Sequence, residues 1–76
     1  MAKLDIIESV HRTNIRRLID EFGEEHESEI MRLYNTQREA EERSARITYF
    51  IPIFVYRTVR EVLRKRYQEV LLLKDS

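Results

Sequence analysis

The sequence contains no cysteine, and it has only one glycine and one proline among its 76 residues. Without cysteine the chain can form neither a disulfide nor a thiolate metal site. Its two histidines, His11 and His26, lie fifteen positions apart, which is too sparse for a closed zinc site. So few glycines and prolines are typical of long helices. The sequence therefore predicts a helical protein with no metal and no cofactor.

Charged residues make up 37% of the chain and apolar residues 42%. The apolar residues recur at regular spacings, which disfavours disorder. We expect residues 1–76 to form a single domain, close to the size below which one core is barely sufficient. Small domains usually gain stability from disulfides, a metal or oligomerisation, and only the last of these remains. Asp5 and Glu8 follow Lys3, so no signal segment is predicted and we expect a cytoplasmic protein.

The apolar periodicity predicts an all-α fold of three helices in up-down-up order, at about residues 3–22, 25–46 and 48–73. The first helix should end at Gly23, where a left-handed cap requires a residue without a side chain. In the second helix a spacing of three and four selects an inward seam. The predicted seam is Ile30, Leu33, Gln37, Ala40, Ser44 and Ile47.

The third segment has high strand propensity at its start, but the chain offers no second strand to pair with it. We expect a helix with Thr48 as N-cap and Pro52 in the first turn, where the missing N–H costs little. The alternative is one long helix kinked at Pro52. One broad face of the third helix is predicted to be buried. Its residues are Ile51, Val55, Tyr56, Val59, Val62, Leu63, Tyr67, Val70 and Leu73.

Three apolar residues, Phe50, Ile53 and Phe54, do not belong to that buried face, and we call them the collar. A helix start that is apolar all round must be covered on two sides. Two further helices of the same chain cover one side, and a symmetric second copy is the simplest cover for the other. The sequence therefore predicts a homodimer that associates through the collar, and its role is predicted to be a protein-interaction or regulatory module.

A basic run crosses the third helix, while six acidic residues without a base lie between Asp20 and Glu29. In an up-down-up bundle these two clusters lie at the same end, so we expect them mainly to neutralise each other. Two alternatives stay open, an acidic protein partner and a nucleic-acid contact through phosphates. The residues that would make either contact are Arg57, Arg60, Arg64 and Lys65.

Other functions find little support in the sequence. No glycine-rich phosphate loop, no nucleophile with a positioned base and no ligand cluster is present, so we predict that the protein is not an enzyme. The apolar block 47–56 is too short to span a membrane, which needs ~20 apolar residues, although it could lie on a membrane surface. A small phage or plasmid inhibitor of a host protein is also consistent with the size and charge pattern.

The chain contains three short motifs, which are Leu33-Tyr34, the stretch Ala45-Arg46-Ile47 with Phe50 and Pro52, and the stretch 57–63 that reads Arg-Thr-Val-Arg-Glu-Val-Leu. Together they resemble a family of short bacterial proteins of unknown function. The resemblance covers about residues 30–64. It implies a bacterial or mobile-element origin and a compact helical domain, and it implies no activity.

Overall fold

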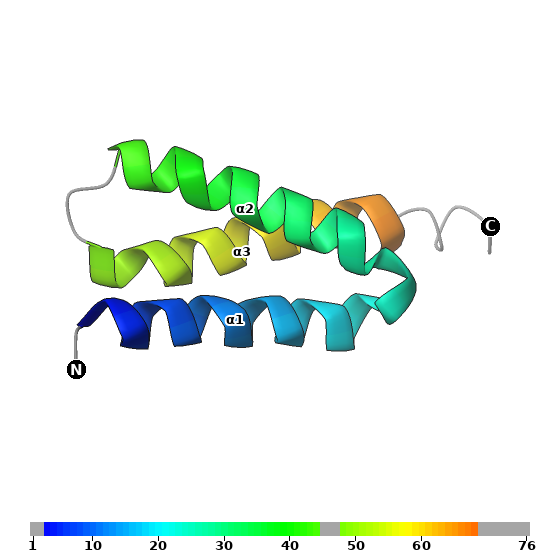
Figure 1. Ribbon diagram of the computed structural model, residues 1–76. Helices are drawn as coiled ribbons and strands as arrows, with labels where there is room; N and C mark the ends of the chain where they lie inside the picture. Colours follow the sequence, from blue (N-terminus) through cyan, green and yellow to red (C-terminus); the bar gives the residue numbers. More distant parts are fainter. Residues whose placement is uncertain (1–2, 45–47, 69–76) are drawn as a thin grey trace.

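The computed structural model describes residues 3–44 and 48–68, and within these ranges every regular element is a helix. Figure 1 shows the three α-helices lying side by side. Their bounds are α1 Lys3–Phe22, α2 Glu27–Ser44 and α3 Ile51–Leu63. Three short elements flank them, the 3-10 turns η1 (Glu24–His26) and η2 (Thr48–Phe50) and the π-helical turn η3 (Arg64–Gln68). Over the described residues the predicted all-α fold with three helices is confirmed.

Helix α1 ends at the predicted place because Gly23 follows it with a φ of 113°. The N–H of Gly23 donates to the carbonyl oxygen of Ile19 at 2.8 Å, and this bond closes the last turn of α1. The ψ of 144° differs from that of the expected left-handed cap, and this extended combination is open essentially to glycine alone. The chain then turns through η1, in which the N–H of His26 donates to the carbonyl oxygen of Gly23 at 3.1 Å.

The start of the third helix differs from the expectation. Thr48 is not the N-cap of α3; that position is occupied by Phe50, without a side-chain hydrogen bond, and Thr48 begins the 3-10 turn η2. Pro52 does lie in the first turn of α3, as predicted. The physical reason is that a proline farther inside an α-helix would clash with the carbonyl group four residues earlier, here that of Thr48.

The core lies where the three helices meet. It is built around Tyr34 and Leu18, and both side chains are fully buried. Helix α3 contributes the predicted face, since Ile51, Val55, Val59 and Leu63 are all buried. Val62 was predicted on the same face, but it is exposed. One small core therefore holds all three helices together.

Helix α2 faces the core with a different set of residues from the predicted seam. Ile30 is buried, but Ala40 and Ser44 are exposed. The buried stripe passes instead through Tyr34, whose hydroxyl group finds polar partners inside the bundle. The rest of the second-helix prediction, residues 45 and 46 with Ile47 of the seam, lies outside the described residues, as does the predicted third-helix stretch 69–73.

Candidate functional site

The collar is exposed in the structure. Phe50, Ile53 and Phe54 keep 49%, 52% and 45% of their surface accessible. The rings of Phe50 and Phe54 lie side by side, with centroids 6.4 Å apart and planes tilted by 51°. The opposite side of the same helix turn is buried through Ile51 and Val55. The start of α3 is therefore apolar all round, and the bundle covers only one half of it.

The exposed apolar surface continues from the collar onto α1. Val10 is 40% exposed, and it lines a shallow groove of about 190 Å³ between α1 and α3 together with Ile53. Ile6 lies one turn before Val10 on the same helix face and is 64% exposed. The groove is also lined by Pro52 and Asn14 and, toward α1's C-terminal half, by Arg17, Tyr56 and Arg57.

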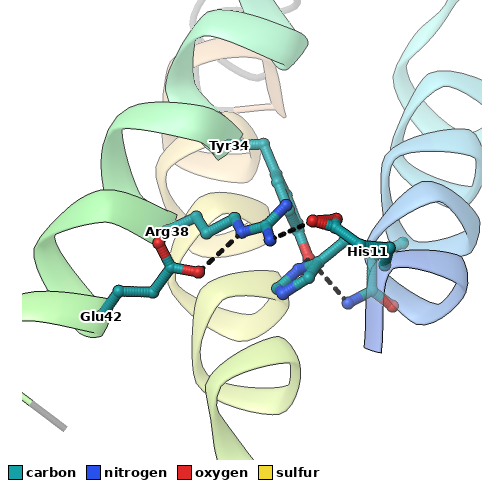
Figure 2. A network of polar contacts seen from close by, with 6 residues as sticks. His11, Tyr34, Arg38 and Glu42 are labelled. Atoms are coloured by element: carbon teal, nitrogen blue, oxygen red, sulfur yellow. Dashed lines mark hydrogen bonds and ion pairs between the residues drawn. The ribbon is translucent and has the colours of Figure 1, made fainter. Parts of the chain in front are cut away.

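A buried polar network lies behind this surface and connects the three helices. The Tyr34 hydroxyl group lies 2.6 Å from His11 Nδ1 and accepts a hydrogen bond from Asn14 Nδ2 at 2.9 Å. Asn14 Nδ2 also donates to the carbonyl oxygen of Pro52 at 3.0 Å. Figure 2 shows His11 and Tyr34 pointing toward each other from α1 and α2. The network thereby joins the first turn of α3, which carries the collar, to the other two helices.

An ion-pair cluster borders the buried network at its outer side. Arg38 on α2 donates to Glu8 on α1 and, at 3.0 Å, to Glu42 one turn away on its own helix. Figure 2 shows the guanidinium group of Arg38 above His11, with Glu42 beside it. The hydrogen bond from Arg38 lowers the pKa of Glu8, and the same bond raises the pKa of Arg38. The cluster links α1 to α2 at the end of the bundle near η2.

His11 is the least satisfied group of the network. Its ring is 2% exposed, and its Nε2 atom is buried without a hydrogen-bond partner. A cavity of about 60 Å³ lies beside it, lined also by Arg38, Glu42 and Thr48. Burial lowers the pKa of His11, and the nearby Arg38 lowers it further. The lowered pKa favours the neutral form of this buried ring.

The basic residues of the third helix occupy different environments. Arg60 donates twice to the carboxylate of Glu21, at 2.9 and 3.0 Å, and Arg66 pairs with Glu29. Two arginines near the end of the third helix therefore pair with acidic residues of the stretch 20–29, as expected for the basic run as a whole. Arg57 lines the groove next to Ile53. Arg64 and Lys65 lie on the exposed surface of η3.

Asn14 and Tyr34 were missed as partners in the sequence. Asn14 and Tyr34 are both buried although each carries a polar group. A polar residue on the buried face of a helix needs a buried hydrogen-bond partner. This rule could have indicated that Asn14 has such a partner. The two residues could not be paired from the sequence, because they are 20 positions apart.

Comparisons with known proteins found no match to this chain among family models, curated proteins or solved structures. The resemblance to short bacterial proteins therefore stays a prediction. Within residues 3–44 and 48–68 no helix is long and apolar enough to cross a membrane. In the same part of the chain, no three residues among His, Cys, Asp and Glu are grouped to hold a metal ion.

Proposed function

We propose that this up-down-up three-helix domain forms a homodimer through the collar and acts as a non-enzymatic protein-interaction or regulatory module. The observation that carries the proposal is the exposure of Phe50, Ile53 and Phe54 at one place on the surface. Single exposed apolar residues are normal, but a contiguous cluster is typical of an interaction site. A 76-residue chain without disulfides has only a small core, and a dimer interface would bury additional apolar surface.

The collar is suited to recognition because it is held on a rigid element. The hydrogen bond from Asn14 to Pro52 fixes the turn of α3 between Phe50 and Ile53. Two aromatic side chains there supply a large contact area with few rotatable bonds, so little conformational entropy is lost when a partner covers them. A second copy would present the same surface, as a two-fold symmetric interface requires.

The test is the solution mass of the wild type beside Phe54→Glu, measured by sedimentation equilibrium over a range of concentrations. Met31→Glu is the matched control, since Met31 is 40% exposed but lies on α2. We expect a dimeric wild type, a dimeric control and a folded monomeric Phe54→Glu, with helicity checked by circular dichroism. A wild type that stays monomeric over the whole range would contradict the proposed dimer.

The nucleic-acid alternative rests on the exposed residues Arg57, Arg64 and Lys65. Arg60 supports it less, because its guanidinium group is already engaged by Glu21. An electrophoretic mobility shift at low and moderate salt separates the two functions. Specific binding that persists at moderate salt and is lost in Arg57→Gln/Lys65→Gln would favour nucleic acid, whereas a shift that disappears with salt reports only general phosphate attraction.

A further inference from the structure

The groove between α1 and α3 changes character from one helical turn to the next. Toward the C-terminal end of α1 it is bridged by the Glu21–Arg60 ion pair. One turn earlier along both helices the corresponding positions are Arg17 and Arg57, which both line the groove. At this turn the groove is therefore bordered by two positive charges, whereas the next turn carries the oppositely charged pair Glu21 and Arg60.

Arg17 and Arg57 have no ionic partner of their own in the part of the chain that the structure describes. Glu21 lies four residues after Arg17, but its carboxylate is used by Arg60. No acidic side chain lines this groove. Because like charges on opposite sides of a groove repel each other, an anion placed between them would be favoured by both.

The remaining walls of the groove are mainly apolar. Val10 contributes from α1 and Ile53 from α3, and Pro52 of the first turn of α3 also lines the groove. Asn14 also lines the groove, and its side-chain amide group donates hydrogen bonds to Tyr34 and to the carbonyl oxygen of Pro52. A volume of about 190 Å³ is smaller than the roughly 300–1,000 Å³ of small-molecule pockets, but it accommodates one or two side chains.

We infer that this groove binds an amphipathic helix of another protein, with an apolar side chain between Val10 and Ile53 and a carboxylate between Arg17 and Arg57. Helices commonly dock into grooves through apolar anchors one turn apart, flanked by charged residues. The charge complementarity selects an acidic helix over a basic one. The groove shares Ile53 with the collar, so a bound helix and a second copy compete for that residue, but Val10 and Arg17 lie on α1, outside the collar.

The test uses two synthetic helical peptides of about 15 residues, close to the shortest length at which isolated helices are marginally stable. Both carry leucines at every third or fourth position. The polar positions are glutamates in one peptide and lysines in the other. The ¹⁵N-labelled protein is titrated with each at about 0.15 M salt, where exposed charges more than about 8 Å apart are largely screened. We expect only the acidic peptide to bind. Its binding should shift the amide signals of Val10, Asn14, Arg17, Ile53 and Arg57.

Three variants locate the contact. Arg17→Glu/Arg57→Glu should weaken binding of the acidic peptide at least about tenfold, equivalent to about 1.4 kcal/mol. Val10→Glu should weaken it similarly while leaving the collar intact. Arg12→Glu/Arg32→Glu makes the same change in net charge at exposed positions that do not line the groove, and it should bind like the wild type.

Several outcomes would overturn the inference. Equal binding of the two peptides, or amide shifts confined to other surfaces, would show that the groove does not select an acidic helix. Saturation by inorganic phosphate or a short single-stranded oligonucleotide at lower concentration than the acidic peptide would assign the two arginines to phosphate. Amide signals of Val10, Asn14 and Arg17, which lie outside the collar, that move with protein concentration alone would assign the groove to a second copy of this chain.

Discussion

Asn14 on α1 donates a hydrogen bond to the carbonyl oxygen of Pro52 at 3.0 Å, 38 positions along the chain. The same amide donates to Tyr34 on α2, so one buried side chain joins all three helices. Pro52 lies between Phe50 and Ile53, so this bond sets where the exposed collar stands relative to the bundle. The interior of the domain and its proposed interaction surface are therefore physically connected.

Asn14→Ala is expected to destabilise the fold because it leaves the Tyr34 hydroxyl and the Pro52 carbonyl without this donor. Buried polar groups that lose their partner cost about 1–3 kcal/mol. Urea unfolding followed by circular dichroism measures the change. Thr13→Ala is the control, because Thr13 is exposed and bonds only to Ser9 on its own helix. An Asn14→Ala protein as stable as the control would show that the network adds nothing to the fold.

The stability of the protein should fall as the pH drops below 6.5, the ordinary pKa of histidine. Burial and Arg38 lower the pKa of His11 in the folded state, although Glu8 and Glu42 raise it in part. In the window between the lowered pKa and 6.5 the unfolded chain binds more protons, so stability increases with pH. Protonation would also place a charge on a ring that is 2% exposed.

The measurement is the free energy of unfolding of wild type and His11→Gln at pH 7.5 and at about pH 5. The wild type should lose more stability than the variant between these values. His26 is present in both proteins, so its contribution cancels in the comparison. The lowered pKa of Glu8 changes the stability only below pH 4.5, the ordinary pKa of glutamate, which lies outside this window. Identical pH slopes for the two proteins would rule out His11 as the source.

Gly23→Ala should destabilise the turn between α1 and α2 by about 1 kcal/mol or more, because an L-residue is strained at a φ of 113°. Thermal unfolding measures the loss. A Cβ at this position would also meet the carboxylate of Glu25. The double variant Gly23→Ala/Glu25→Ala removes that contact, so if it regains wild-type stability, steric contact and not backbone strain is the cause.

The bidentate pair between Arg60 and Glu21 should show a favourable coupling in a double-mutant cycle of Glu21→Gln and Arg60→Gln. Glu21 also raises the pKa of Arg60 through this hydrogen bond. Both groups are partly accessible to solvent, so the coupling should be small and should weaken as salt is added. Coupling that is unchanged between low and high salt would indicate that packing and not charge connects the two residues.

The periodicity of the apolar residues was sufficient to predict the three helices. The stripe on α3 from Ile51 to Leu63 and the end of α1 before Gly23 follow from local rules, because helical spacing and glycine conformations are properties of neighbouring residues. The exposed position of Phe50 and Phe54 followed from the same projection. The start of α3 was placed three residues too early, because the 3-10 turn at Thr48 depends on the clash that Pro52 would cause farther inside the helix.

The sequence by itself determined the class of fold and placed Phe50, Ile53 and Phe54 off the buried face of α3. The pairing of Arg60 with Glu21 and of Arg66 with Glu29 was decided by the tertiary structure. Only the tertiary structure decided the partners of Asn14, His11 and Tyr34, and it brought Arg17 next to Arg57 across a groove. The reason is the rotation of each helix about its own axis. Spacing shows that a helix has an inward face, but the residues that meet across two helices depend on how all three pack around one core.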